Sequence, residues 1–328
     1  MTRRRELLIA WGATLCAPRI ALGQASAKVY RIAILQAGAR DVNDRLSVVP
    51  FKSGLAALGY VEGRNLVIEI RYADGKLERL PALAAELIAT KPDLIFAPPA
   101  PATTAVKALT STIPIVYCYV SDPVALGFAK SLAQPGGNLT GLSNYSHAIA
   151  SKRVELLSEI VPRLARLSVW YSPDAVNDPI ELREVESAAA RLGIQVLELK
   201  ARNAQDYDQA AAASRKWNAE SIYVTSNPTN FANRKQIIAL VAGLKRAATY
   251  PTTIFVEDGG LMTYTVNFPD LSRRAAAYVD RILRGAKPGD LPVEQPSNFE
   301  LVINLRTAKA LGVKIPTGLL QRADQVIE

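Results

Sequence analysis

Apolar positions along this chain follow two alternating patterns. Short continuous runs of Val, Ile, Leu and aromatic residues are each followed by a stretch whose apolar residues recur every three or four positions. A continuous run is typical of a parallel strand buried on both faces, and the second pattern is typical of an amphipathic helix. The first part of the chain predicts strands at 30–35, 66–71, 93–97 and 115–120, with helices at 46–58, 77–90 and 102–109.

The same alternation restarts after a polar loop. Beyond residue 120 the chain predicts a brief helix at 127–132 and an extended segment at 138–142. Strands then follow at 168–171, 194–199, 221–225 and 253–256, with helices at 148–160, 179–192, 206–216 and 233–247. The tail predicts strands at 262–266 and 302–305 and helices at 272–284 and 307–311. Two such series predict an α/β fold with two doubly wound parallel-sheet lobes.

The first 27 residues have the pattern of an export signal. Arg3, Arg4 and Arg5 precede an apolar run at 7–17 that is too short to span a bilayer. Small residues allow cleavage after Gly23 or after Ala27. A general secretory signal and a twin-arginine signal both fit, and either predicts a periplasmic protein.

Removal of that signal lowers the formal charge from +9 to +6. The remaining lysines and arginines are scattered and not interleaved with aromatic residues, so no nucleic-acid partner is expected. Cys118 becomes the only cysteine, which rules out an intramolecular disulfide, and its apolar strand predicts a buried structural thiol.

The sequence lacks the usual catalytic constellations. His147 is the only histidine, and no Gly-x-Ser-x-Gly elbow is present to pair with it. Its position predicts a solvated or helix-capping residue, with a place in a cleft as the alternative. One histidine and one thiol cannot form the common zinc sites, although an all-oxygen site remains open. Gln36-Ala37-Gly38-Ala39 does not match a dinucleotide fingerprint, and we expect no cofactor.

A binding cleft is better supported, because ligands of open α/β sheets bind beyond the carboxyl ends of the strands. Helix starts at Ala102 and Thr229 can offer backbone N–H groups to a carboxylate, and Asp122 or Glu257 can pair with an amine. Asp122 is equally consistent with a turn or cap before Pro123. The predicted ligand-binding residues are Gln36, Ala100, Thr103, Tyr119, Ser121, Asp122, Asn144, Tyr145, Tyr171, Asn227, Thr229 and Glu257.

Five segments carry a resemblance to a known family. They are LGYVEGRNL at 58–66, STIPI at 111–115, the stretch 114–145, GGLM at 259–262 and FELVINL at 299–305. In order, and across nearly the whole mature chain, they resemble the tryptophan/tyrosine-type periplasmic solute-binding proteins of ABC importers.

The resemblance implies a type I-like periplasmic binding fold whose lobes are joined by a three-strand hinge. Residues 28–143 plus 260–292 would form the first lobe, and residues 144–259 plus 293–328 the second. It further implies a monomer that closes on an amino acid or aromatic acid and delivers it to a membrane permease. One departure broadens the ligand class to other small organic solutes: Pro99 and Ala100 stand where the family commonly has Gly followed by Thr or Ser.

Two other functions remain open from the residues alone. One is the ligand-binding subunit of a membrane sensor. The other is a secreted enzyme that uses Asp122 or Glu257 as a base.

Overall fold

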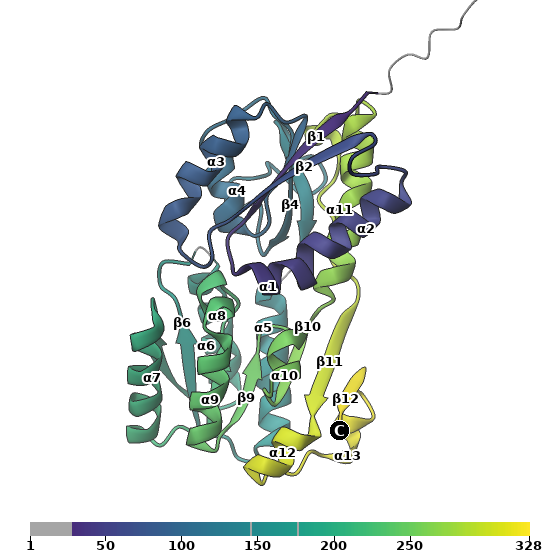
Figure 1. Ribbon diagram of the computed structural model, residues 1–328. Coiled ribbons are helices and arrows are strands. Elements are labelled where there is room, and N and C mark those ends of the chain that lie inside the picture. The colour runs from purple at the N-terminus through teal and green to yellow at the C-terminus, as the bar shows by residue number, and fades with distance from the viewer. Residues whose placement is uncertain (1–27, 145, 176) are drawn as a thin grey trace, which may run out of the picture.

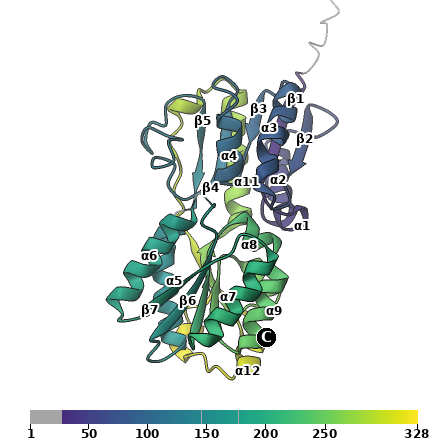
Figure 2. The ribbon, with the colours of Figure 1, turned by 90° about the vertical axis from the view of Figure 1, so that its left-hand side faces the viewer.

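The computed structural model describes residues 28–144, 146–175 and 177–328, with the backbone alone for 146–148. The predicted export signal and Tyr145 lie outside the described residues. The chain forms two α/β lobes, one above the other in Figure 1 and turned by 90° in Figure 2. Within the described ranges, no helix has the length and apolar character needed to cross a membrane.

The first lobe is built on a five-stranded sheet in which every strand pair is parallel, with the order β2-β1-β3-β4-β5. Its strands are β1 (Tyr30–Gln36), β2 (Leu66–Tyr72), β3 (Leu94–Phe96), β4 (Ile115–Val120) and β5 (Leu139–Ser143). Its helices are α1 (Arg40–Asn43), the π-helical turn η1 (Asp44–Val48), α2 (Val49–Ala57), the 3-10 turn η2 (Leu77–Arg79), α3 (Leu80–Ala89) and α4 (Ala100–Lys107). The predicted strands of this lobe are confirmed, whereas the brief helix at 127–132 is wrong, because a turn at 123–127 is followed by bends and irregular chain up to 132.

Side chains of the first sheet alternate between two apolar layers. Ile32 and Ile34 of β1 pack in the cluster that contains α2, and Ala33 and Leu35 pack in the cluster that contains α3 and α4. The layer on α2 is completed by α11 (Phe268–Leu283), which comes from far along the chain (Figure 1). Both faces are buried, which explains the continuous apolar runs in the sequence.

The packing of α11 on α2 requires a glycine. A Cβ atom on Gly54 would lie 2.5 Å from the backbone oxygen of Arg273 and 2.8 Å from the Cβ of Ala276. We expect Gly54→Ala to lower the free energy of unfolding by about 1 to 3 kcal/mol, because the two helices must move apart. Urea unfolding of the mature chain measures this loss.

Gly243 provides a matched control, since it also lies inside a helix but has open space around its Cβ position. Gly243→Ala is expected to raise stability by about 0.5 to 1 kcal/mol through helix propensity. Equal effects of the two substitutions would contradict a tight contact between α2 and α11.

The second lobe contains a seven-stranded sheet with the order β12-β11-β10-β9-β8-β6-β7. Its strands are β6 (Arg166–Tyr171), β7 (Gln195–Lys200), β8 (Ser221–Val224), β9 (Ala247–Tyr250), β10 (Met262–Val266), β11 (Phe299–Asn304) and β12 (Gln325–Ile327). The accompanying helices are α5 (Ser146–Ile160), α6 (Asp178–Arg191), α7 (Ala204–Lys216), α8 (Pro228–Ala232), α9 (Arg234–Leu244), α10 (Thr253–Glu257), α12 (Leu305–Leu311) and α13 (Thr317–Leu320), and the 3-10 turn η3 (Pro288–Asp290) lies in the return segment. The sheet is mixed rather than fully parallel, because β11 runs antiparallel to β10.

One strand of the second lobe was predicted in the wrong place. The structure has a helix, α10, where a strand was expected at 253–256, and the strand β9 lies at Ala247–Tyr250. The preceding helix ends at Leu244 because Lys245 adopts a left-handed conformation with φ of 54°. No glycine marks this stop, so Ala247 and Ala248 look like a continuation of the helix.

The chain crosses between the sheets three times. It passes from β5 to α5, from β10 to α11, and from the segment after Glu294 to β11. The second crossing corrects the predicted lobe boundary at residue 260: β10 pairs with β9 and β11, so the chain stays in the second lobe up to Val266. Glu294 still bonds to the first lobe through Gly141, which puts the third crossing just beyond it.

Candidate functional site

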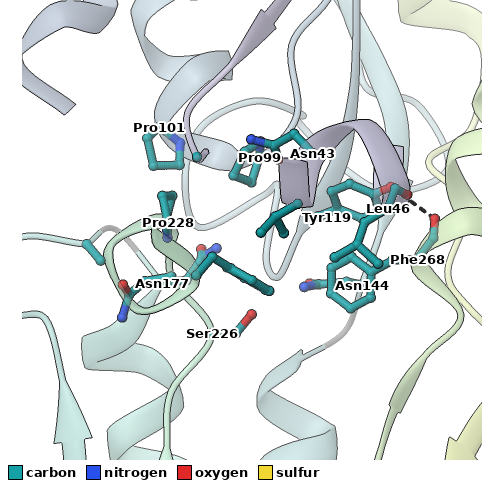
Figure 3. A pocket seen from close by; sticks show the side chains of 15 residues that line it. Asn43, Leu46, Pro99, Pro101, Tyr119, Asn144, Asn177, Ser226, Pro228 and Phe268 are labelled. Atoms are coloured by element: carbon teal, nitrogen blue, oxygen red, sulfur yellow. Dashed lines mark hydrogen bonds between the residues drawn. The ribbon is translucent and has the colours of Figure 1, made fainter. Parts of the chain in front are cut away.

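A cleft lies between the two lobes and holds about 650 Å³ of open space. This volume includes the solvent space at the mouth of the cleft. Most of its lining comes from segments that follow β1, β3, β5, β6 and β8, together with Tyr119 near the end of β4 and the start of α11 (Figure 3). The lining residues are Gly38, Val42, Asn43, Leu46, Pro99, Pro101, Tyr119, Asn144, Ala175, Asn177, Ser226, Asn227, Pro228, Phe231 and Phe268.

Tyr119 forms an aromatic wall together with Phe268. Their ring centroids lie 4.6 Å apart with 40° between the planes. The Tyr119 hydroxyl lies 2.9 Å from the carbonyl oxygens of both Leu46 and Phe268, and it also bonds to the Ser272 hydroxyl. Burial raises the pKa of Tyr119 well above its ordinary value, so the group stays neutral. With its hydroxyl engaged by the protein, Tyr119 offers a ligand mainly its ring.

Amide side chains supply most of the polar lining. Asn144 is only 4% exposed, and its Oδ1 atom has no hydrogen-bond partner among the described residues. The Oδ1 atom of Asn177 is likewise buried without a partner in the part of the chain that the structure describes. In Figure 3 the ends of the Asn144 and Ser226 side chains approach the same space. A buried acceptor without a partner costs free energy.

The loop that carries Ser226 and Asn227 is held from behind by two buried carboxylates. Asp178 accepts hydrogen bonds of 2.7 Å from Asn227 Nδ2, Thr225 Oγ1 and the Ser172 N–H. Glu181 accepts a 3.1 Å bond from the Ser226 N–H. Burial, and then the nearby charge of Glu181, raises the pKa of Asp178 to about 7.

A fully buried arginine completes this network. Arg153 is 1% exposed and pairs with Glu181 at 3.0 Å. It also donates to the backbone oxygens of Tyr264 at 2.8 Å and Pro251 at 3.0 Å, and Tyr223 donates to Glu181 at 2.8 Å. The network therefore ties the loop of Ser226 to β10 and to the segment after β9.

Ion pairs connect the two lobes beside the cleft. Arg234, at the start of α9, bonds to Asp258 of its own lobe at 2.7 Å and to Asp41 of the first lobe at 2.8 Å. Arg45 of the first lobe pairs with Glu257 of the second. These contacts exist only while the lobes are close together, so they favour the closed arrangement.

Three of the predicted ligand-binding residues line the cleft, namely Tyr119, Asn144 and Asn227. Tyr145 lies outside the described residues. The remaining eight, which do not line it, are Gln36, Ala100, Thr103, Ser121, Asp122, Tyr171, Thr229 and Glu257. Ligand binding by any of the twelve stays a prediction.

Several of these eight side chains bond within the protein. Gln36 donates to Ser47 at 3.0 Å, and Thr103 donates to the backbone oxygen of Ala97 at 2.6 Å. Asp122 accepts from the N–H groups of Val124 and Ala125, which is the turn alternative. The Tyr171 hydroxyl donates to Glu198 at 3.3 Å.

Most of the lining missed from sequence comes from helices. Val42, Asn43 and Leu46 belong to the helical segment after β1, and Phe268 opens α11. A signal for Phe268 was present, because Asn267 caps the helix by accepting from the Asp270 N–H and a proline follows in the first turn. If that cap had been recognised, the helix would have been predicted to begin after Asn267, beside the cleft.

The described residues contain no group of three or more His, Cys, Asp and Glu side chains suited to a metal ion.

Two α/β lobes, joined by three crossings and closed over a cleft lined from both, define a two-lobed binding protein. A family model described as "ABC transporter substrate binding protein" matches residues 31–327. The chain belongs to this family. Its members are solute-binding proteins.

Three proteins illustrate what this chain is similar to. A tyrosine-binding protein of Clostridioides difficile (strain R20291) is 28% identical over 265 residues, which cover 80% of this chain and 76% of that protein. The ABC domain of Streptococcus pneumonia in complex with L-Trp is 25% identical, with a TM-score of 0.84 over 92% of this chain and all of that one. A ligand-free, open substrate binding protein with adhesive properties from Clostridium difficile is also 25% identical, with a TM-score of 0.66 over 91% of this chain and 99% of that one.

The last two relatives differ in state but are equally distant in sequence. The chain superposes more closely on the structure with L-Trp bound than on the ligand-free, open one, so its lobes lie nearer to the ligand-bound arrangement. The ion pairs of Arg234 with Asp41 and of Arg45 with Glu257 agree with that arrangement.

Proposed function

We propose that this chain is the periplasmic solute-binding component of an ABC importer, which closes its lobes on a small organic solute and delivers it to a membrane permease. The observation that carries this proposal is the cleft itself, whose lining comes from both lobes. A ligand that contacts both lobes stabilises the closed state by its difference in affinity for the two states.

The names of the relatives support an aromatic amino acid or a solute of similar size. The aromatic rings of Tyr119, Phe231 and Phe268 line the cleft and can pack on a flat ring system. Amino acids, aromatic acids and other small organic solutes are therefore the classes to test.

Thermal unfolding of residues 28–328 in the presence of a panel from these classes, with nucleobases included, tests the proposal. A solute at a hundredfold excess over its dissociation constant is expected to stabilise the protein by about 2.7 kcal/mol. Small-angle scattering of the same samples should show a more compact molecule with ligand than without it. Chemical conversion of the compound, or binding without compaction, would contradict the proposal.

Asp41 allows the closed state to be tested separately. Asp41→Asn removes the pair between the lobes and leaves the bond between Arg234 and Asp258 intact. Because the Asp41 side chain is 62% exposed, we expect affinity to fall only about two- to fivefold, and less at high salt. Titration calorimetry at two salt concentrations measures this change.

Glu62→Gln is the matched control, since Glu62 is 51% exposed and pairs with Lys52 inside the first lobe. It should leave the affinity unchanged. A loss of affinity equal to that of Asp41→Asn would mean that general charge, rather than the contact between lobes, governs binding.

A further inference from the structure

The turn that follows β2 in the first lobe contacts helix α8 of the second lobe. A Cβ atom on Gly75 would lie 3.0 Å from the Cβ atom of Ala232 and 3.7 Å from the backbone oxygen of Pro228. Because glycine has no Cβ atom, the backbone of the turn packs directly on the methyl group of Ala232. In Figure 1 this turn lies just above α8. The lobes therefore meet here through the two smallest residue types.

The turn is fixed within the first lobe. Asp74 and Gly75 both adopt a left-handed conformation, with φ of 55° and 79°. The Gly75 N–H donates to the Ala37 carbonyl oxygen at 2.9 Å. Ala37 directly precedes Gly38, which lines the cleft. The position of the turn is therefore tied to the first-lobe wall of the cleft.

Helix α8 is likewise fixed within the second lobe. Asn227 caps it by accepting from the Asn230 N–H at 2.8 Å, and the fully buried Asn230 side chain donates to the Thr225 carbonyl oxygen at 2.8 Å. Phe231, which directly precedes Ala232, lines the cleft. Any change in the distance between α8 and the turn therefore changes the width of the cleft.

An ion pair draws the lobes together beside this contact. Arg234, two residues beyond Ala232, bonds to Asp41 of the first lobe at 2.8 Å. Two fixed surfaces in contact resist further approach, because closely packed atoms leave no room for overlap. The ion pair therefore favours closure, and the contact of Gly75 with Ala232 limits it.

We propose that the contact between Gly75 and Ala232 sets how far the lobes close, and thereby the size of the solute that both lobes can contact at once. Neither residue lines the cleft, so both act as positioning residues. A larger side chain at either position holds the lobes further apart, and the solute loses contacts with one of them. This inference rests on the proposed solute-binding function and adds residues that determine its specificity.

Gly75→Asn tests the limit on closure. Asparagine tolerates a left-handed backbone, and its side chain starts from the Cβ position that lies 3.0 Å from Ala232. In titration calorimetry on residues 28–328, L-tryptophan is expected to bind the variant about tenfold more weakly than the wild type. Small-angle scattering of the solute-saturated proteins should show a larger radius of gyration for the variant.

Gly63→Asn is the matched control. Gly63 also lies in a turn of the first lobe, its φ of 81° is close to the 79° of Gly75, and no described atom lies within 4 Å of its Cβ position. This variant should bind L-tryptophan as the wild type does and show the same radius of gyration. Equal affinities of the Gly63 and Gly75 variants would overturn the inference.

Removal of the Ala232 methyl group tests whether the two residues act on each other. The double variant Gly75→Asn with Ala232→Gly regains part of the space that the asparagine occupies. It is expected to bind L-tryptophan about threefold more tightly than Gly75→Asn alone. Damage confined to the turn does not respond to a change on the other lobe, so a double variant that binds as weakly as Gly75→Asn contradicts the inference.

Ala232→Leu tests the link to solute size. With the lobes held apart, the smaller L-tyrosine should lose about threefold more affinity than the larger L-tryptophan. Ala242→Leu is the matched control, since Ala242 is exposed on α9 of the same lobe and does not line the cleft. An unchanged ratio in Ala232→Leu, or the same change in both variants, would mean that the contact does not set solute size.

If L-tryptophan or L-tyrosine does not bind the wild type, the most stabilising compound of the thermal panel and its next larger homologue replace the pair. A panel without any ligand overturns the proposed function together with the inference. Wild-type affinity of Gly75→Asn overturns the inference and leaves the proposed function standing.

Discussion

Replacement of Arg153 by alanine is expected to lower the free energy of unfolding by about 3 to 5 kcal/mol. The substitution leaves the Glu181 carboxylate without its positive partner in a site where both side chains are 1% exposed. It also leaves the backbone oxygens of Tyr264 and Pro251 without their donor. Urea unfolding at pH 7 measures the loss.

Two further variants isolate the cause of that loss. Arg322→Ala removes an exposed pair with Glu159 and is expected to cost less than about 1 kcal/mol. The double variant Arg153→Met with Glu181→Gln removes both buried charges and should be more stable than Arg153→Ala alone. A loss below 1 kcal/mol for Arg153→Ala would contradict the buried network.

The second large effect is a dependence of stability on pH that comes from Asp178. The pKa of this carboxyl is about 7 in the folded protein, because the side chain is fully buried beside Glu181, and near 3.9 when unfolded. Between these values the folded state holds a proton that the unfolded state releases. This contribution to stability is therefore complete below about pH 4, is lost as pH rises to about 7, and stays constant above that; the total loss is at most about 4 kcal/mol.

Asp178→Asn removes the titration, so the difference in stability between wild type and variant should change from pH 4.5 to about pH 7 and then level off towards pH 8. Urea unfolding at four pH values across this range measures it. Asp174→Asn serves as the control, because Asp174 is 62% exposed. A difference for Asp178→Asn that is constant with pH would contradict the raised pKa.

The sheets could be predicted from sequence wherever both faces of a strand are buried. Every residue of Ile115–Val120 is buried, so the apolar run has no polar interruptions and is recognised at once. The segment 247–257 failed because its elements are short. Ala247 and Ala248 carry a helix-like composition in a strand, and Ile254 to Val256 carry β-branched and aromatic residues in a helix. Packing in the second lobe overrides both propensities.

Strand direction was a second feature that the sequence could not predict. The pattern of Phe299–Asn304 predicts a buried strand but cannot distinguish parallel from antiparallel pairing. The path of the chain decides it: the return from α11 through η3 and Glu294 enters the second sheet from the first lobe. β11 therefore runs antiparallel to β10.

The candidate site was predicted where it follows from strand ends. Tyr119, Asn144 and Asn227 lie in or just after β4, β5 and β8, at the edge where parallel strands finish. Leu46 was missed because an apolar side chain on an amphipathic helix reads as core, and Phe268 was missed because the helix was expected to begin only at residue 272. These positions line a cleft because the two lobes face each other there, which the sequence does not show.

The position of α11 also sets the order in which the protein can be completed during synthesis. This helix covers Phe51 and Leu55 in the first lobe, yet it is made after β6 to β10 of the second. A growing chain that ends before Asn267 therefore keeps an apolar face of its first sheet open to solvent. The first lobe is synthesised first, but its apolar core can be completed only after β6 to β10 of the second lobe and then α11 have been synthesised.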